Sequence, residues 1–207
     1  MIRLPLEPKF DWVEFANQNN SFRYKLILKS NAIVVNLKEQ KYNLLKKILL
    51  LSDTHSYIDD RIISYAKEVD EIWHAGDIGN IDVIKQLEDI KPVRAVYGNI
   101  DDQEIRSIYP LNNRFIIEGI DVWITHIGGY PGKYNPKIKK EITENPPRVF
   151  ICGHSHILKA MPDKQLDLIH LNPGAVGKHG FQQVRTMLRF EVNNGELENL
   201  EVIEFKK

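Results

Sequence analysis

Polar residues of metal-binding types recur at five places along the chain, each directly after a short apolar run. The members of this set are Asp53, His55, Asp77, Asn99, His126, His154 and His156. In Asp53-x-His55 and His154-x-His156 the two side chains point the same way if the chain is extended, so each pair can grip an ion from one side. Seven nitrogen and oxygen ligands exceed the needs of one tetrahedral site. They predict two metal ions that share a bridging carboxylate.

The apolar runs before these residues are predicted to be strands of a parallel sheet. Buried-strand patterns cover residues 47–51, 71–74 and 93–97, and helical patterns cover 58–69 and 80–87 between them. This alternation predicts right-handed strand–helix–strand crossovers. Because ligands bind at the carboxyl ends of such strands, we expect the polar residues to meet in one crevice.

Helix starts are predicted at Ser56, at Asn80 and at Asn135-Pro136, because these side chains can accept hydrogen bonds from a first helical turn. The second half of the chain is richer in strands. Its strand patterns cover residues 114–118, 121–125, 148–151, 157–161, 167–171, 184–192 and 198–205. Gly119 and Asn194-Gly195 mark hairpin turns between neighbouring strands.

The whole motif series resembles that of the calcineurin-like metallophosphoesterases, in particular the branch of small phosphodiesterases that is related to the scaffold subunit of retromer. The motifs that carry this resemblance are Asp53-x-His55, Gly76-Asp77, Gly98-Asn99, His126 and Gly153-His154-x-His156. The resemblance covers about residues 46–205. It implies an α/β fold, a four-layer α/β/β/α sandwich of two mixed sheets. It also implies a divalent-metal-dependent phosphoesterase that hydrolyses phosphodiesters with a hydroxide bridging two metal ions.

The resemblance also implies a ligand set. The first metal would take Asp53, His55, Asp77 and His156, and the second would take Asp77, Asn99, His126 and His154. Catalysis is assigned to Asp77, Asn99 and His126. Two ions ~3.5–4 Å apart lower the pKa of a shared water from ~15.7 toward neutrality, which supplies the hydroxide. Manganese is the expected metal, with nickel, iron or zinc as alternatives, and the expected substrate is a small phosphodiester or phosphate ester.

One position departs from the family pattern. Many relatives carry a histidine after the Gly-Asn pair to protonate the leaving oxygen, and Ile100 stands there in this chain. A missing general acid typically costs about 10²–10⁴ in rate on poor leaving groups. We therefore expect weak activity on alkyl monoesters and better activity on aryl or activated diesters. Asp101, the next residue, is either a substitute acid or a helix cap before Gln103.

Several further residues are candidates for supporting or substrate-binding roles. His74 is expected to be a core or supporting residue rather than a ligand. Asn172 either positions the metal ligands or belongs to a plain Asn-Pro-Gly turn, and His179 either contacts substrate or lies on a solvated loop. The loop 128–134 is equally compatible with a substrate-facing segment and an ordinary connection.

The formal net charge of zero is the sum of two unlike parts. Residues 1–44 carry seven basic and four acidic side chains, a charge of +3, which leaves −3 for residues 45–207. We expect residues 45–207 to form the metallophosphoesterase domain. Residues 1–44 are either an extension, with a strand around 24–36 and aromatic docking residues, or a segment that is not made because translation starts at Leu45.

Composition disfavours several functional classes. The balanced charge gives no support for nucleic-acid binding, and no apolar run approaches the ~20 residues that span a bilayer. Cys152 is the single cysteine and no secretory signal is visible, which predicts a cytoplasmic protein. The alternative to an enzyme is a non-catalytic scaffold of the retromer-subunit type that retains a metal site.

Overall fold

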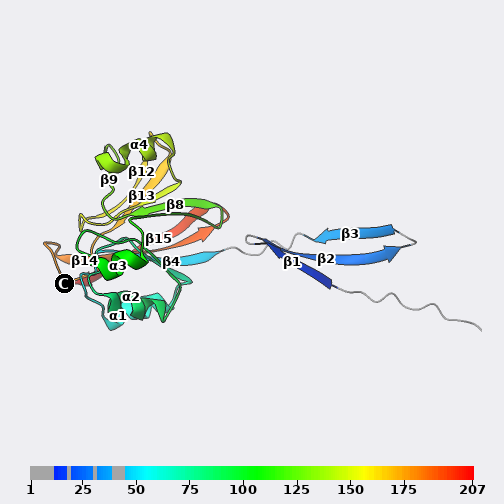
Figure 1. The fold of residues 1–207 in the computed structure, drawn as a ribbon, viewed down its shortest axis with the longest axis horizontal. Helices are drawn as coiled ribbons and strands as arrows, with labels where there is room; N and C mark the ends of the chain where they lie inside the picture. The colour runs from blue at the N-terminus through cyan, green and yellow to red at the C-terminus, as the bar shows by residue number, and fades with distance from the viewer. Residues whose placement is uncertain (1–11, 18–19, 30–31, 39–44) are drawn as a thin grey trace, which may run out of the picture. The chain divides into compact units, whose positions relative to one another are not determined.

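The computed structural model of the chain describes residues 12–17, 20–29, 32–38 and 45–207 (Figure 1). The chain divides between Asn43 and Leu44 into two compact units, and each is described here by itself. Within the described residues, no helix combines the length and the apolar character needed to cross a membrane.

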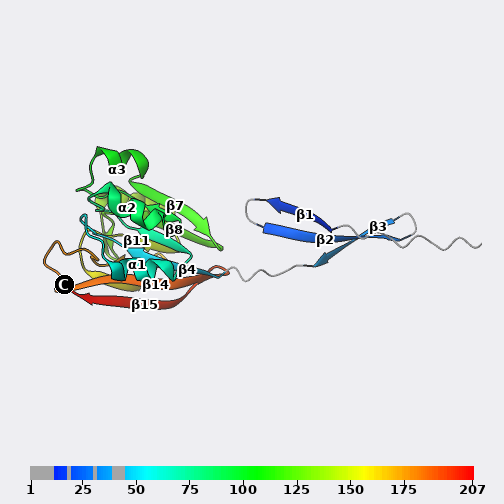
Figure 2. The ribbon, with the colours of Figure 1, turned by 90° about the horizontal axis from the view of Figure 1, so that it is seen from below.

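The first unit contains an antiparallel three-stranded sheet, visible in Figure 2. Its strands are β1 (Trp12–Asn17), β2 (Asn20–Lys29) and β3 (Ala32–Lys38), in the order β1-β2-β3. The expected single strand over 24–36 is therefore wrong, because Leu26 pairs with Val35 across two strands. Residues 1–11 and 39–44 of the expected extension lie outside the described residues, as do the aromatic docking side chains. A translation start at Leu45 stays a prediction.

The second unit is built on two five-stranded mixed sheets. The first contains β4 (Lys46–Leu51), β5 (Glu71–His74), β6 (Val93–Ala95), β14 (Val184–Asn193) and β15 (Glu196–Lys206), in the order β15-β14-β4-β5-β6. The second contains β7 (Asn112–Ile117), β8 (Ile120–Thr125), β11 (Val149–Ile151), β12 (Leu158–Asp163) and β13 (Leu168–Pro173), in the order β12-β13-β11-β8-β7. Each sheet has three parallel strands, β4-β5-β6 or β13-β11-β8. In the first sheet the antiparallel pair β14–β15 continues from β4, and in the second sheet β12 and β7 pair antiparallel at the two edges.

Helices cover the outer faces of the two sheets (Figure 1). These helices are α1 (Asp60–Lys67), α2 (Ile81–Glu88), α3 (Gln103–Ile108) and α4 (Pro136–Glu144). Leu49 and Leu51 of β4 pack into a core with residues of α1, α2 and α3, while Ile48 and Leu50 face the second sheet. A third core joins α4 to the far side of the second sheet through Phe150. The predicted four-layer α/β/β/α sandwich is confirmed.

Short hairpins and caps set the ends of these elements. The turn Asn194-Gly195 joins β14 to β15 with φ of 47° and 88°, the left-handed values that a two-residue hairpin turn requires. A smaller hairpin, β9 (Gly129–Tyr130) and β10 (Lys133–Tyr134), follows β8. The predicted N-caps Asn80 of α2 and Asn135 of α4 are confirmed, since each accepts from a first-turn backbone N–H.

The predicted N-cap of the first helix, Ser56, is wrong. Asp59 caps α1, and its Oδ1 accepts from the backbone N–H of Ile62 at 3.0 Å. Ser56 instead belongs to the loop after β4, where it adopts a left-handed φ of 64° and donates its N–H to the carbonyl of Ile78. The loop therefore runs past the expected cap before the helix begins.

Candidate metal centre

All five polar segments lie at carboxyl ends of parallel strands, and they come from both sheets. Asp53 follows β4, Asp77 follows β5 and Asn99 follows β6. From the second sheet, His126 follows β8 and His154 follows β11. The two sheets are joined at this edge, because the His154 N–H donates to Asp53 Oδ2 at 3.1 Å.

A first group of candidate ligands is formed by Asp53, His55 and His156, whose donor atoms all lie within 4.8 Å of one another. His156 Nε2 lies 3.2 Å from Asp53 Oδ1 and 3.3 Å from His55 Nε2. Asp53 is fully buried, and its Oδ1 has no hydrogen-bond partner among the described residues. A buried carboxylate oxygen without a partner is costly, and a bound cation would satisfy it.

Asp77, His126 and His154 form a second group of the same size. His126 Nδ1 donates to the carbonyl of Ala75 at 2.8 Å, which leaves the lone pair on Nε2. That nitrogen is buried 3.2 Å from Asp77 Oδ1 and has no hydrogen-bond partner within the described chain. A backbone carbonyl that fixes the tautomer is the usual support of a metal-binding histidine.

Asp77 lies between the two groups. Its Oδ1 faces His126, and its Oδ2 lies 3.6 Å from His55 Nε2 of the first group. The segment that carries Asn99 runs against the same carboxylate, because a Cβ built on Gly98 would collide with Asp77 Oδ1. Asp77 thus directs one carboxylate oxygen toward each group of candidate ligands, which is the arrangement that a ligand bridging two ions requires. The donor set, carboxylates with imidazoles, fits divalent transition metals.

Most of the candidate ligands have an unusual backbone. The left-handed region holds Asp53 (φ 53°), His55 (46°), Asp77 (53°), His154 (66°) and His156 (56°). Residues other than glycine are uncommon in this region, and they cluster at functional sites. The sharp turns aim these side chains inward immediately after the strands end.

The electrostatics favour the metal-binding protonation form at Asp77, His55 and His154, whereas the neighbouring carboxylates raise the pKa of His126 and His156. Burial raises the pKa of Asp77, but the nearby His126 ring and the hydrogen bond from the Ile100 N–H outweigh it, so the net pKa is below the usual range. Burial lowers the pKa of His126, but the Asp77 carboxylate reverses this, and the net pKa is raised. Burial lowers the pKa of both His55 and His154, which keeps these rings neutral at pH 7.

His74 lies behind the loops and connects them. Its Nδ1 accepts from the Gly76 N–H at 3.1 Å, so its Nε2–H donates to Thr54 Oγ1 at 3.0 Å. Thr54 donates in turn to the carbonyl of Ile78 at 3.0 Å. Burial lowers the pKa of His74 to about 4, so the ring is neutral and holds the turns on both sides of the site.

Asp101 is engaged by the backbone. It is buried and accepts from the N–H groups of Gly79 and Gly98, both at 2.7 Å. Its predicted capping role is wrong, because Asp102 caps α3. Asp101 therefore holds the glycine turns beside Asp77.

Asn172 and His179 contact different loops of the site. Asn172 donates to the Gly153 carbonyl at 2.9 Å and to Ser155 Oγ at 3.2 Å, which fixes the loop carrying His154. His179 is exposed, and its ring centre lies 4.6 Å from that of His55.

Gln182 is a supporting residue that the sequence did not reveal. Its side-chain oxygen accepts from His156 Nδ1 at 3.1 Å, and its amide donates to the carbonyls of Gly177 and His179. The contact turns His156 Nε2 toward Asp53. No local signal distinguishes Gln182 from the neighbouring Gln183, because the contact joins segments 26 residues apart.

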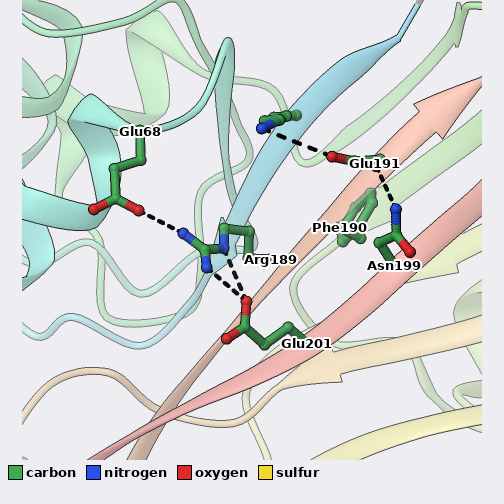
Figure 3. A pocket seen from close by; sticks show the side chains of 7 residues that line it. Glu68, Arg189, Phe190, Glu191, Asn199 and Glu201 are labelled. Atoms are coloured by element: carbon green, nitrogen blue, oxygen red, sulfur yellow. Dashed lines mark hydrogen bonds and ion pairs between the residues drawn. The ribbon is translucent and has the colours of Figure 1, made fainter.

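A separate hollow of about 490 Å³ lies along β14 and β15 (Figure 3). Arg189 there donates to Glu68 at 2.6 Å and to Glu201 at 2.7 Å. None of the candidate ligands lines it. Its charged groups pair with one another, which is the arrangement of a structural surface network.

Comparison with known proteins agrees with this geometry. Residues 47–195 match the calcineurin-like phosphoesterase superfamily domain, a span that contains all seven candidate ligands. The chain belongs to this superfamily. A probable metallophosphoesterase of Methanothermobacter thermautotrophicus is 30% identical over 131 residues, which are 61% of this chain and 74% of the relative.

Two solved structures share the fold of this phosphoesterase domain. One is a single mutant of Vps29 from Entamoeba histolytica, with a TM-score of 0.61, 16% identity and coverage of 77% of this chain and 99% of that one. The other is described as a novel archaeal phosphodiesterase, with a TM-score of 0.61, 22% identity and coverage of 76% and 99%. Metallophosphoesterases use divalent metals, and the phosphoesterase domain described here has two candidate groups to hold them.

Proposed function

We propose that this phosphoesterase hydrolyses small phosphodiesters and depends on two divalent ions, with manganese as the expected metal. The observation that carries the proposal is the position of Asp77, whose two carboxylate oxygens face His126 and His55 of different candidate groups. When bound, the two ions would supply Lewis acidity and an activated water at neutral pH.

The candidate ligands differ in how far they are exposed to solvent, and this difference indicates where substrate enters. Asp77 and His126 are buried and hold fixed geometry, whereas His154 is exposed at the mouth of the second group. Substrate therefore approaches from the His154 side. Asp101 has both carboxylate oxygens occupied by backbone N–H groups, and Ile100 cannot give a proton. Neither residue therefore supplies a proton to the leaving group, which favours esters with acidic leaving groups.

The test is hydrolysis of bis(p-nitrophenyl) phosphate by the full chain with Mn²⁺. Asp77→Asn should abolish metal-dependent turnover, because it removes the charge shared by both groups. Asp167→Asn is the matched control, since the Asp167 side chain is 98% exposed and remote from the ligand set. Equal rates for wild type and Asp77→Asn, both at background, would refute an enzymatic role.

The second candidate is a scaffold that keeps the metal site without catalysis. Exposed apolar side chains at the site favour it, namely Ile100, Ile127, Ile157 and Phe181. Each of the three isoleucines directly follows a candidate ligand in the sequence, and the Phe181 ring stacks on His156. A partner could cover this apolar rim. A chain that binds Mn²⁺ but hydrolyses no activated diester would support the scaffold.

A further inference from the structure

A pocket of about 410 Å³ opens beside the second candidate group. Its walls come from the loop and hairpin after β8, the start of α4, the loop after β11, and β12. Figure 1 shows α4, β9 and β12 close together at one end of the unit. His154 and Ser155 line it, so it is continuous with the mouth of the proposed site. A pocket of this volume accommodates a group the size of a substituted aromatic ring.

One part of the pocket wall contains an aromatic ring and two lysines. Lys159 Nζ lies 3.7 Å from the ring centre of Tyr130, and Lys133 pairs with Tyr130 across the β9–β10 hairpin. All three residues line the pocket. Cross-strand partners lie on the same face of a hairpin, so Lys133 and Lys159 lie close to the same ring.

No opposing charge balances these lysines in the part of the chain that the structure describes. No aspartate or glutamate lines the pocket, and neither lysine has an acidic partner within 4.0 Å there. Tyr134, another wall residue, donates its hydroxyl to Asp163 at 2.7 Å, which occupies that acid. The pocket therefore combines flat apolar surface with unbalanced positive charge.

We infer that this pocket binds one ester arm of the substrate, and that the arm is planar and carries a second negative charge. The inference rests on the proposed function, because it takes the phosphoryl group to lie at the candidate ligands. Tyr130 and Ile157 supply apolar contact for the arm, while Lys133 and Lys159 select for its charge. The loop 128–134 is then substrate-facing.

The first test compares two diesters that release the same product. p-Nitrophenyl 4-carboxyphenyl phosphate and p-nitrophenyl phenyl phosphate differ only in the carboxylate group of the retained arm. Two partly exposed ion pairs predict a kcat/KM about tenfold higher for the charged arm. The preference should shrink between roughly 0.01 M and 1 M salt, as the screening length falls from ~30 to ~3 Å.

Variants that remove the lysine charges test whether these two lysines cause the preference for the carboxylated diester. Lys133→Gln combined with Lys159→Gln should bring the ratio of the two kcat/KM values close to one. The ratio is taken within each protein, so changes in folding or metal loading cancel. Lys164→Gln is the matched control, because Lys164 is exposed and does not line the pocket, and it should retain the full preference.

A binding experiment separates this inference from the proposed function. 4-Carboxyphenylphosphonate and phenylphosphonate have no hydrolysable ester bond, and titration calorimetry measures their affinities with and without Mn²⁺. Tighter binding of the carboxylated compound, lost in the double lysine variant, supports the pocket even if no diester is turned over. Equal affinities together with equal kcat/KM values would overturn the inference, and turnover of both diesters would leave the proposed function standing.

Discussion

Asp59→Ala should destabilise the second unit far more than the loss of an ordinary helix cap. Asp59 accepts from the Ile62 N–H as N-cap of α1, and its Oδ2 also lies 3.0 Å from Nη2 of Arg185. Arg185 is fully buried, and its other described acceptor is the Val176 carbonyl, at 3.1 Å. The substitution therefore removes a cap and leaves a buried guanidinium without its carboxylate.

The expected size follows from these two losses. An N-cap contributes about 1 kcal/mol. Breaking a buried ion pair costs about 3–5 kcal/mol, and the lower end applies because the Asp59 side chain is 18% exposed. The sum is about 4 kcal/mol. Asp102→Ala is the matched control, since Asp102 caps α3 from an exposed position, and it should cost about 1 kcal/mol.

Urea unfolding followed by far-ultraviolet circular dichroism measures the difference. With a slope of about 2 kcal/mol per molar urea, the Asp59→Ala midpoint should lie roughly 1.5 M below that of Asp102→Ala. Equal midpoints would refute the reasoning, because the buried pair would then contribute nothing beyond the cap.

The same carboxylate predicts a pH dependence. Burial raises the pKa of Asp59, but hydrogen bonds from Ile62, Arg61, Tyr57 and Arg185 more than offset this, so the net pKa lies far below the ordinary 3.8. A carboxylate whose pKa is lower in the folded state than in the unfolded state stabilises the fold at pH values above its unfolded-state pKa. This stabilisation is lost as the pH falls toward the folded-state pKa. Wild type should lose stability below about pH 4, and Asp59→Ala should lose less.

Three further predictions concern the metal site. Gly98→Ala places a Cβ against Asp77 Oδ1 and should weaken Mn²⁺ binding in a calorimetric titration by about 10–100-fold; an unchanged affinity would contradict the geometry. Ile100→His should raise kcat on alkyl diesters by about 10²-fold with little effect on aryl diesters, and an unchanged alkyl rate would rule out a missing acid. Chelation should lower the melting temperature by roughly 5–10 °C from that at 100-fold excess Mn²⁺ over Kd, whereas Asp77→Asn should show no such shift.

Much of the fold was predictable because its signals are local. The buried strand β4 is a run of leucine and isoleucine, and the caps Asn80 and Asn135 stand directly before their helices. The rule that parallel strands present ligands at their carboxyl ends then brings residues from five segments together. Neither the strand runs nor this rule depends on knowing which distant segments touch.

The errors occurred where tertiary contacts decide the local structure. Ser56 has the residue type of a cap, but its N–H bonds the loop after β5, so the helix begins later. Asp101 was a candidate cap for α3, but its carboxylate accepts hydrogen bonds from the N–H groups of Gly79 and Gly98. Asp102 is the N-cap of α3 instead. These contacts join segments more than twenty residues apart in two of the three cases, and no periodicity in the sequence reports them.

The left-handed backbone at the candidate ligands opposes stability. A histidine with φ of 46–66°, as at His55, His154 and His156, costs about 1 kcal/mol or more, whereas glycine adopts the same backbone without a steric penalty. A chain that only needed this fold would become more stable by exchanging those histidines for glycine. The imidazoles therefore destabilise the fold at positions where glycine would not, and the free energy of binding an ion is what would offset this.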